Sequence, residues 1–188
     1  PSVNAAASIS AYCAAAGSKC HIYVPAYPSE GKIKQIKAYG SSIVKVEGSR
    51  DDTAAATLAA ADKTWYASHV YNPIFYEGTK TIGLEIEKQA KPDWIVVPVG
   101  NGTMLIGIYR AYKELGRMPR ILAVQSELCA PIYAAFHGLP EPEIKQTLAE
   151  GIAVGLPMRK QELVNIVKES GGTVITVSDE AVDAANTE

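Results

Sequence analysis

The chain has 188 residues, of which 47% are apolar and 20% charged, and its formal net charge is −2. This composition excludes a disordered tail, a collagen-like chain and a small disulfide-stapled protein, and the length allows one domain or two small lobes. The balanced charge argues against nucleic-acid binding. No apolar run approaches the roughly 18 residues that a membrane span requires, so we expect no membrane partner.

The first part of the chain alternates helical patterns with two short strands. In chain order we predict a helix over 5–16, a strand over 21–25, a helix over 33–39, a strand over 43–46 and a helix over 51–61. Asn4 is placed to cap the first helix and Gly17 to end it, because asparagine caps helix N-termini and glycine accepts left-handed backbone. A proline break at 71–73 predicts a passage between two lobes, residues 1–70 and 71–188.

The second part continues the alternation. We predict helices over 82–90, 105–112 and around 163–167, and strands over 95–99, 121–125 and 174–177. The segments 95–99 and 121–125 are nearly continuous apolar runs, which predicts strands buried on both faces. Strands that alternate with helices need crossover connections, so the sequence predicts an α/β fold of parallel sheets with helices on both faces.

The sharpest candidate site is Gly100-Asn101-Gly102-Thr103, between the predicted strand 95–99 and the predicted helix 105–112. Two glycines allow a tight turn and a close approach of backbone to a ligand. Successive N–H groups and the positive end of a helix together suit a phosphate. The spacing alone leaves open a tight turn without a ligand, because short glycine patterns are weak signals.

Two further segments are candidates. Ser2, Val3 and Asn4 stand at the start of the first predicted helix, where Asn4 can serve as a helix cap alone. Glu150 and Gly151 lie between apolar neighbours, and sequence does not decide between a loop turn and a carboxylate that faces a ligand.

Other catalytic and metal-binding patterns are absent from the sequence. The three histidines lack metal-ligand spacing, and we expect them to be solvated or to cap helices. Cys13, Cys20 and Cys129 form no CxxC pair, which favours buried thiols in a reducing, cytoplasmic compartment. We expect Lys80, near Glu77, to lie on a solvated helix face.

Several segments, taken in order, resemble the threonine synthase family, which belongs to the tryptophan-synthase-β-like (fold type II) enzymes that use pyridoxal 5′-phosphate (PLP). The segments that carry the resemblance are 4–8, 23–25, 72–81, 97–103, 123–127 and 147–155. Each segment is modest, but their order and spacing are specific and cover essentially the whole chain. Residues 72–86 look more like threonine synthase than its relative threonine dehydratase, whereas 147–154 suit either.

The resemblance implies that the turn formed by Gly100, Asn101, Gly102, Thr103 and Met104 binds the cofactor phosphate. It also implies that Asn4 bonds the ring hydroxyl of the cofactor, that Ser2 lies beside the carboxylate of an amino-acid substrate, and that Glu150 and Gly151 lie beside the cofactor ring. The implied reaction converts O-phosphohomoserine and water to threonine and phosphate. The resemblance further implies a homodimer.

The sequence also departs from the family. The resemblance places the family's Schiff-base lysine upstream of Pro1, and its contact to the pyridine nitrogen after the point where this chain stops. Val3 stands where the family has glycine, and we expect its branched side chain to crowd a tight turn. The absence of an initiator methionine agrees with a non-native junction at Pro1-Ser2-Val3.

We therefore expect an internal piece of a longer enzyme, incomplete at both ends and inactive by itself. A non-catalytic α/β module that lost the lysine is the alternative from another class. The two alternatives differ in whether a lysine motif precedes Pro1 in the native gene product.

Overall fold

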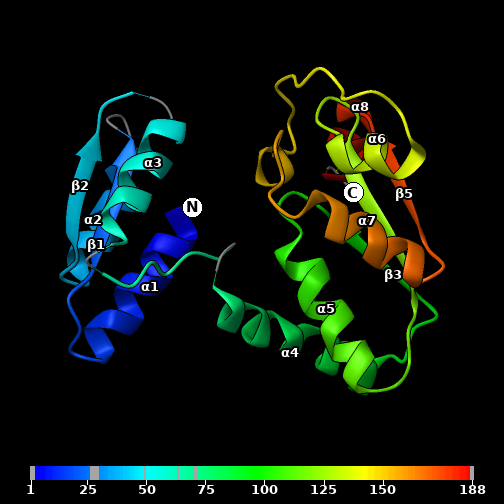
Figure 1. The fold of residues 1–188 in the computed structure, drawn as a ribbon, viewed down its shortest axis with the longest axis horizontal. Helices are drawn as coiled ribbons and strands as arrows, with labels where there is room; N and C mark the ends of the chain where they lie inside the picture. Colours follow the sequence, from blue (N-terminus) through cyan, green and yellow to red (C-terminus); the bar gives the residue numbers. More distant parts are fainter. Residues whose placement is uncertain (1–2, 26–29, 49, 63, 70–71, 187–188) are drawn as a thin grey trace. The chain divides into compact units, whose positions relative to one another are not determined.

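A computed structural model describes residues 3–25, 30–48, 50–62, 64–69 and 72–186. The chain falls into two compact units, residues 1–72 and 73–188, and each is described by itself (Figure 1). The sequence places a passage at 71–73, beside this division. The assignment of residues 1–70 and 71–188 to two lobes of an enzyme stays a prediction. None of the helices in the described part of the chain has the length and apolar character needed to cross a membrane.

The described residues of the first unit form three helices and a small parallel sheet. Its elements are α1 (Val3–Ala15), β1 (His21–Pro25), α2 (Glu30–Ala38), β2 (Ser42–Val46) and α3 (Arg50–Ala60). Strands β1 and β2 pair in parallel, with His21 opposite Ser42. The buried apolar core of this unit is small and consists of Ala6, Ala7, Ile22, Val24 and Ile36.

Helix α1 ends as the sequence predicts but begins differently. Gly17 adopts a φ of 63° just after the helix, and Ser18 donates its N–H to the Cys13 carbonyl at 2.8 Å. This left-handed ending is the one that the glycine predicts. At the other end, the helix begins at Val3, so the prediction that Asn4 caps it is wrong. The backbone of Asn4 is already helical, whereas a cap residue lies outside the helix.

The second unit is built on a larger parallel sheet. Its elements are α4 (Pro73–Gln89), β3 (Trp94–Pro98), α5 (Thr103–Glu114), β4 (Arg120–Ser126), α6 (Pro131–His137), the 3₁₀ turn η1 (Glu150–Ile152), α7 (Lys160–Glu169), β5 (Thr173–Val177) and α8 (Asp179–Asn186). The strand order is β3-β4-β5, and both pairs are parallel. The predicted α/β class with parallel sheets is therefore confirmed.

The largest differences from the predicted helices lie in the second unit. Helix α4 begins at Pro73 rather than near Ile82, because proline fits the first helical position, where no N–H is needed. Helices α6 and α8 have no counterpart among the predicted helices. Both are short, and a helix of that length carries little periodicity in its sequence.

The two faces of the larger sheet are unequal. One face is buried against apolar side chains of α5 and α7; its residues include Ile95, Val97, Ile121, Ala123 and Val174. On the opposite face Val96 is 62% exposed and Trp94 46% exposed. The prediction that strand 95–99 is buried on both faces is therefore wrong. Strand β3 lies at the edge of the sheet, and no part of the described chain buries these two side chains.

Candidate functional site

The predicted phosphate turn lies at the carboxyl end of β3, where ligands collect in parallel α/β sheets. Gly102 occupies the cap position of α5 with a φ of 73°, which favours glycine. An ideal Cβ at Gly102 would lie 2.1 Å from Cδ2 of Leu163, a side chain of α7. Both the backbone conformation and the packing therefore require glycine at this position.

The N–H groups of this turn are available to an anion. Val99 donates its N–H to the Val124 carbonyl at 2.9 Å, and Ile106 donates its N–H to the Gly102 carbonyl at 2.9 Å. Between them, the N–H groups of Gly100, Asn101 and Gly102 have no acceptor within the part of the chain that the structure describes. Free N–H groups at a helix N-terminus are the donors that bind phosphate. The turn therefore fits the phosphate group that the resemblance implies.

The candidate segment around Glu150 and Gly151 lies against this turn. An ideal Cβ at Gly100 would be 3.1 Å from Cα of Ile152 and 3.1 Å from Cγ2 of Val154. Glu150 and Gly151, on the 3₁₀ turn η1, are exposed. The structure thus brings the segment 150–154 to the glycine turn, although about 50 positions separate the two in sequence.

Asp179 anchors the approach to that segment. Its carboxylate accepts the Thr147 hydroxyl at 2.5 Å and the Leu148 N–H at 2.9 Å. Ala149 in turn donates its N–H to Oγ1 of Thr147 at 3.1 Å. Sequence patterns did not single out Asp179. The available signal was an acidic residue two positions after the end of a strand, where a side chain can reach the carboxyl edge of the sheet.

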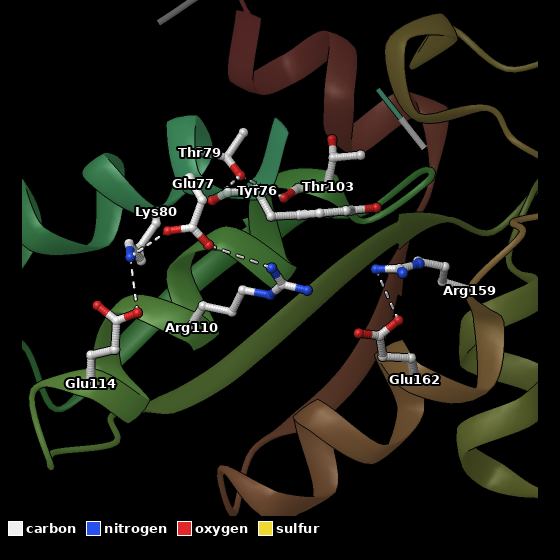
Figure 2. Close-up of polar contacts among 9 residues, drawn as sticks. All are labelled: Tyr76, Glu77, Thr79, Lys80, Thr103, Arg110, Glu114, Arg159 and Glu162. Carbon is white, nitrogen blue, oxygen red and sulfur yellow. Dashed lines mark hydrogen bonds and ion pairs between the residues drawn. The ribbon is translucent and has the colours of Figure 1, made fainter. Parts of the chain in front are cut away.

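The start of α4 is fastened to the start of α5 (Figure 2). Oγ1 of Thr79 donates to the carbonyl of Thr103, the first residue of α5, at 3.2 Å. Tyr76 is fully buried, and the guanidinium groups of Arg110 and Arg159 each lie 4.8 Å from the centroid of its ring. These contacts hold the N-terminus of α5, and therefore the glycine turn, in place.

Lys80 differs from its predicted setting. Its side chain is only 16% exposed, and Nζ lies 2.6 Å from Glu77 and 2.9 Å from Glu114 (Figure 2). Hydrogen bonds to Glu77 and Glu114 raise the pKa of Lys80. Lys80 thus joins α4 to α5 through two ion pairs instead of lying free on a solvated helix face.

The remaining predicted site residues belong to the first unit. Pro1 and Ser2 lie outside the described residues, and nothing is described of the side chains of Val3 and Asn4. The contacts of Ser2 with substrate and of Asn4 with cofactor therefore stay predictions, as do the junction at Pro1-Ser2-Val3 and the lysine expected upstream of Pro1.

The structure also shows how metal-ligating side chains and thiols are placed in the described residues. The described residues contain no cluster of three metal-ligating side chains. Cys129 is buried as expected, whereas Cys13 and Cys20 are only half-buried. The prediction of buried thiols is therefore wrong for these two, because the small core of the first unit covers them incompletely.

This chain is similar to one protein family and to several curated relatives. The family described as pyridoxal-phosphate dependent enzyme matches residues 2–187. The threonine synthase of Methanosarcina acetivorans is 34% identical, and the match covers 97% of this chain and 49% of the relative. For the threonine synthase of Bacillus sp. the corresponding values are 35%, 95% and 52%. The chain spans about half the length of these relatives.

The similar solved structures are of enzymes with other names. The threonine deaminase of T.th. matches with a TM-score of 0.79 and 26% identity, over 98% of this chain and 62% of that one. Maize serine racemase has a TM-score of 0.79 and 23% identity over 96% of this chain and 55% of its own, a likeness of fold alone. The family match covers nearly the whole sequence, and the fold agrees with it. The chain therefore belongs to the family of pyridoxal-phosphate-dependent enzymes.

Proposed function

We propose that this chain is the phosphate-binding part of a PLP-dependent threonine synthase, which converts O-phosphohomoserine and water to threonine and phosphate. The observation that carries the proposal is the turn at 100–102, whose N–H groups have no acceptor in the described chain. The similarity to threonine synthases over nearly the whole chain supports this choice of reaction. When bound, PLP supplies an electron sink for the substrate.

In this proposal the backbone of Gly100–Met104 holds the phosphate dianion. Its N–H groups donate to the phosphate oxygens, and the positive end of α5 adds a favourable charge interaction. Glu150 and Gly151 line the cofactor ring, which agrees with the packing of Ile152 against Gly100. Asn4 and Ser2 keep their proposed contacts with the ring hydroxyl and the substrate carboxylate, and the enzyme is a homodimer.

A second candidate function is a threonine dehydratase-like lyase. The similarity to the threonine deaminase of T.th. at a TM-score of 0.79 favours it. The two reactions differ in one requirement that a site must meet. A threonine synthase binds a second anion, the phosphate of its substrate, whereas a deaminase of threonine does not.

The first experiment tests phosphate recognition by this chain. The chain is titrated with PLP, pyridoxal and inorganic phosphate while the amide signals of Gly100, Asn101 and Gly102 are followed by NMR. We expect PLP to bind at least about tenfold more tightly than pyridoxal, because charge-assisted hydrogen bonds are the stronger ones. Equal affinities, with no response of these amides, would show that the turn does not bind phosphate.

The second experiment separates the two reactions. Residues 1–188 replace the matching half of the Methanosarcina acetivorans threonine synthase, and the purified chimera is given O-phosphohomoserine or threonine. We expect PLP-dependent release of phosphate from the first substrate, and none from the isolated chain. Release of ammonia from threonine without release of phosphate would support the dehydratase-like function instead. The unaltered parent enzyme is the control.

A further inference from the structure

We propose that Gln125 is a positioning residue that sets the direction of the Gly100 N–H. This inference rests on the proposed function, in which that N–H is the first donor to the cofactor phosphate. In the sequence, Gln125 stands out only as a member of the family-like segment 123–127, without a role of its own. Its side chain is completely buried in β4, the central strand of the larger sheet.

The Gln125 side chain joins two backbone segments that are distant in sequence. Its Nε2 donates to the carbonyl of Val99 at 3.0 Å. Its Oε1 accepts the N–H groups of Ile132 at 2.8 Å and Tyr133 at 3.0 Å, both in the first turn of α6. The donors of α6 require the oxygen on their side, and the Val99 carbonyl requires the nitrogen on its side. The amide is therefore held in one orientation.

The bond to Val99 acts on Gly100 through the peptide plane. The carbonyl of Val99 and the N–H of Gly100 belong to the same planar, trans peptide unit, so they point in opposite directions. Glycine has no Cβ to resist rotation of this peptide unit. The hydrogen bond from Gln125 holds the carbonyl inside the sheet and thereby directs the Gly100 N–H away from Gln125.

The test compares two buried polar residues of the second unit in the full chain. Gln125→Met retains the length of the side chain but removes both its donor and its acceptor. Ser170→Ala is the matched control, because Ser170 is also buried and accepts the N–H of Ile121 at the other end of β4. Loss of a buried hydrogen-bonding side chain destabilises the fold in both variants.

Two measurements separate positioning from stability. The residual dipolar coupling of the Gly100 N–H reports the direction of that bond without any ligand, and titration with PLP reports affinity. We expect Gln125→Met to change the coupling and to weaken PLP binding about tenfold, the size of one lost hydrogen bond to a charged group. Ser170→Ala should leave both unchanged. An unchanged coupling in Gln125→Met, or an unchanged PLP affinity where the wild type binds PLP, would overturn the inference.

Gln125→Glu tests the same point if the methionine variant does not fold. The protonated acid of this variant can donate to the Val99 carbonyl and accept from α6, whereas the ionised carboxylate can only accept. The carbon signal of the carboxyl group shows which form is present at each pH. We expect the PLP affinity, taken relative to wild type at the same pH, to fall when the carboxyl ionises and to recover when it is protonated. An affinity ratio that stays constant while the carboxyl group ionises would contradict the inference.

The proposed function and this inference fail in different ways. If the wild-type amides at 100–102 do not respond to PLP, the phosphate assignment fails, while the coupling in Gln125→Met still tests whether Gln125 directs the N–H. If the wild-type amides respond but Gln125→Met binds PLP as tightly, the phosphate assignment stands and the positioning role is wrong.

Discussion

The two units of this chain share a parallel α/β design but differ in how they fill their cores. The first unit packs Ala6, Ala7 and three larger aliphatic side chains around two strands. The second buries Tyr76, Tyr112 and many large aliphatic side chains around three strands. The proposed phosphate turn belongs to the second unit. A site made of backbone N–H groups needs a scaffold that keeps peptide orientations constant, and a larger close-packed core provides one.

Two left-handed glycines, one in each unit, also differ in how closely they are packed. Gly40 in the first unit has a φ of 77° and nothing within 4 Å of its ideal Cβ, because it only ends a helix. Gly102 has a similar φ of 73°, but its ideal Cβ would meet Leu163. The turn that carries the proposed site is thus packed as well as tightly bent, whereas the turn at Gly40 is open.

The largest effect expected from this comparison is on the cores themselves. Ile121 and Ile36 are both fully buried, one in each unit. Ile121→Ala should lower the free energy of unfolding of the second unit by about 4 kcal/mol, near the upper end for such truncations, and Ile36→Ala should cost the first unit about 2 kcal/mol. Urea unfolding, followed by one probe in each unit, measures both. Equal costs would remove the proposed difference in packing.

A somewhat smaller effect is expected at the two glycines. Gly40→Ala should cost about 1 kcal/mol, from backbone strain alone. Gly102→Ala should cost about 3 kcal/mol, because overpacking against Leu163 adds to the same strain, and it should abolish PLP binding. Chemical unfolding and PLP titration check these values. Equal effects of Gly102→Ala and Gly40→Ala in both measurements would show that Leu163 does not restrict this position.

Within the second unit, Asp179 holds a segment close to the proposed site. Asp179→Ala removes the acceptor for Thr147 and Leu148 and should cost about 1–2 kcal/mol. We expect faster hydrogen exchange at Leu148 and Ala149, without a change at Gly17 in the first unit. Asp179→Asn keeps one carbonyl acceptor and should lie between wild type and the alanine variant. Unaltered exchange in Asp179→Ala would show that this carboxylate does not anchor the segment.

The smallest effect is expected at an exposed ion pair. Lys113 Nζ lies 2.6 Å from Glu169, and this hydrogen bond, together with one from the Tyr109 hydroxyl, lowers the pKa of Glu169 below its ordinary 4.5. A lowered folded-state pKa stabilises the fold above pH 4.5, and this contribution is lost as the pH falls through the folded-state pKa. Glu169→Gln should therefore be slightly less stable than wild type at pH 7, and the difference should vanish in acid. Thermal unfolding of both proteins across this pH range measures the difference. A difference in stability that does not change with pH would show that the ion pair contributes nothing.

Much of the fold follows from short-range sequence patterns. In the described part of the chain, the five strands begin and end within one residue of their predicted bounds, because alternating and continuous apolar runs reflect local burial. The end of α1 at Gly17 and the turn at 100–102 also follow from the sequence, since glycine accepts their backbone conformations without strain. The local pattern alone does not show whether Pro73 begins a helix or interrupts one.

The parts that only the tertiary structure decided depend on residues far apart in sequence. Gln125 meets Val99 across 26 positions, and Thr147 meets Asp179 across 32. The exposure of Val96 likewise depends on which elements cover the sheet, not on the apolar run that contains it. The sequence by itself therefore determined the strands, the end of α1 and the glycine turn, because these depend on neighbouring residues. Tertiary packing decided which side chains hold that turn in place, because a buried polar group takes whichever partner the fold brings to it.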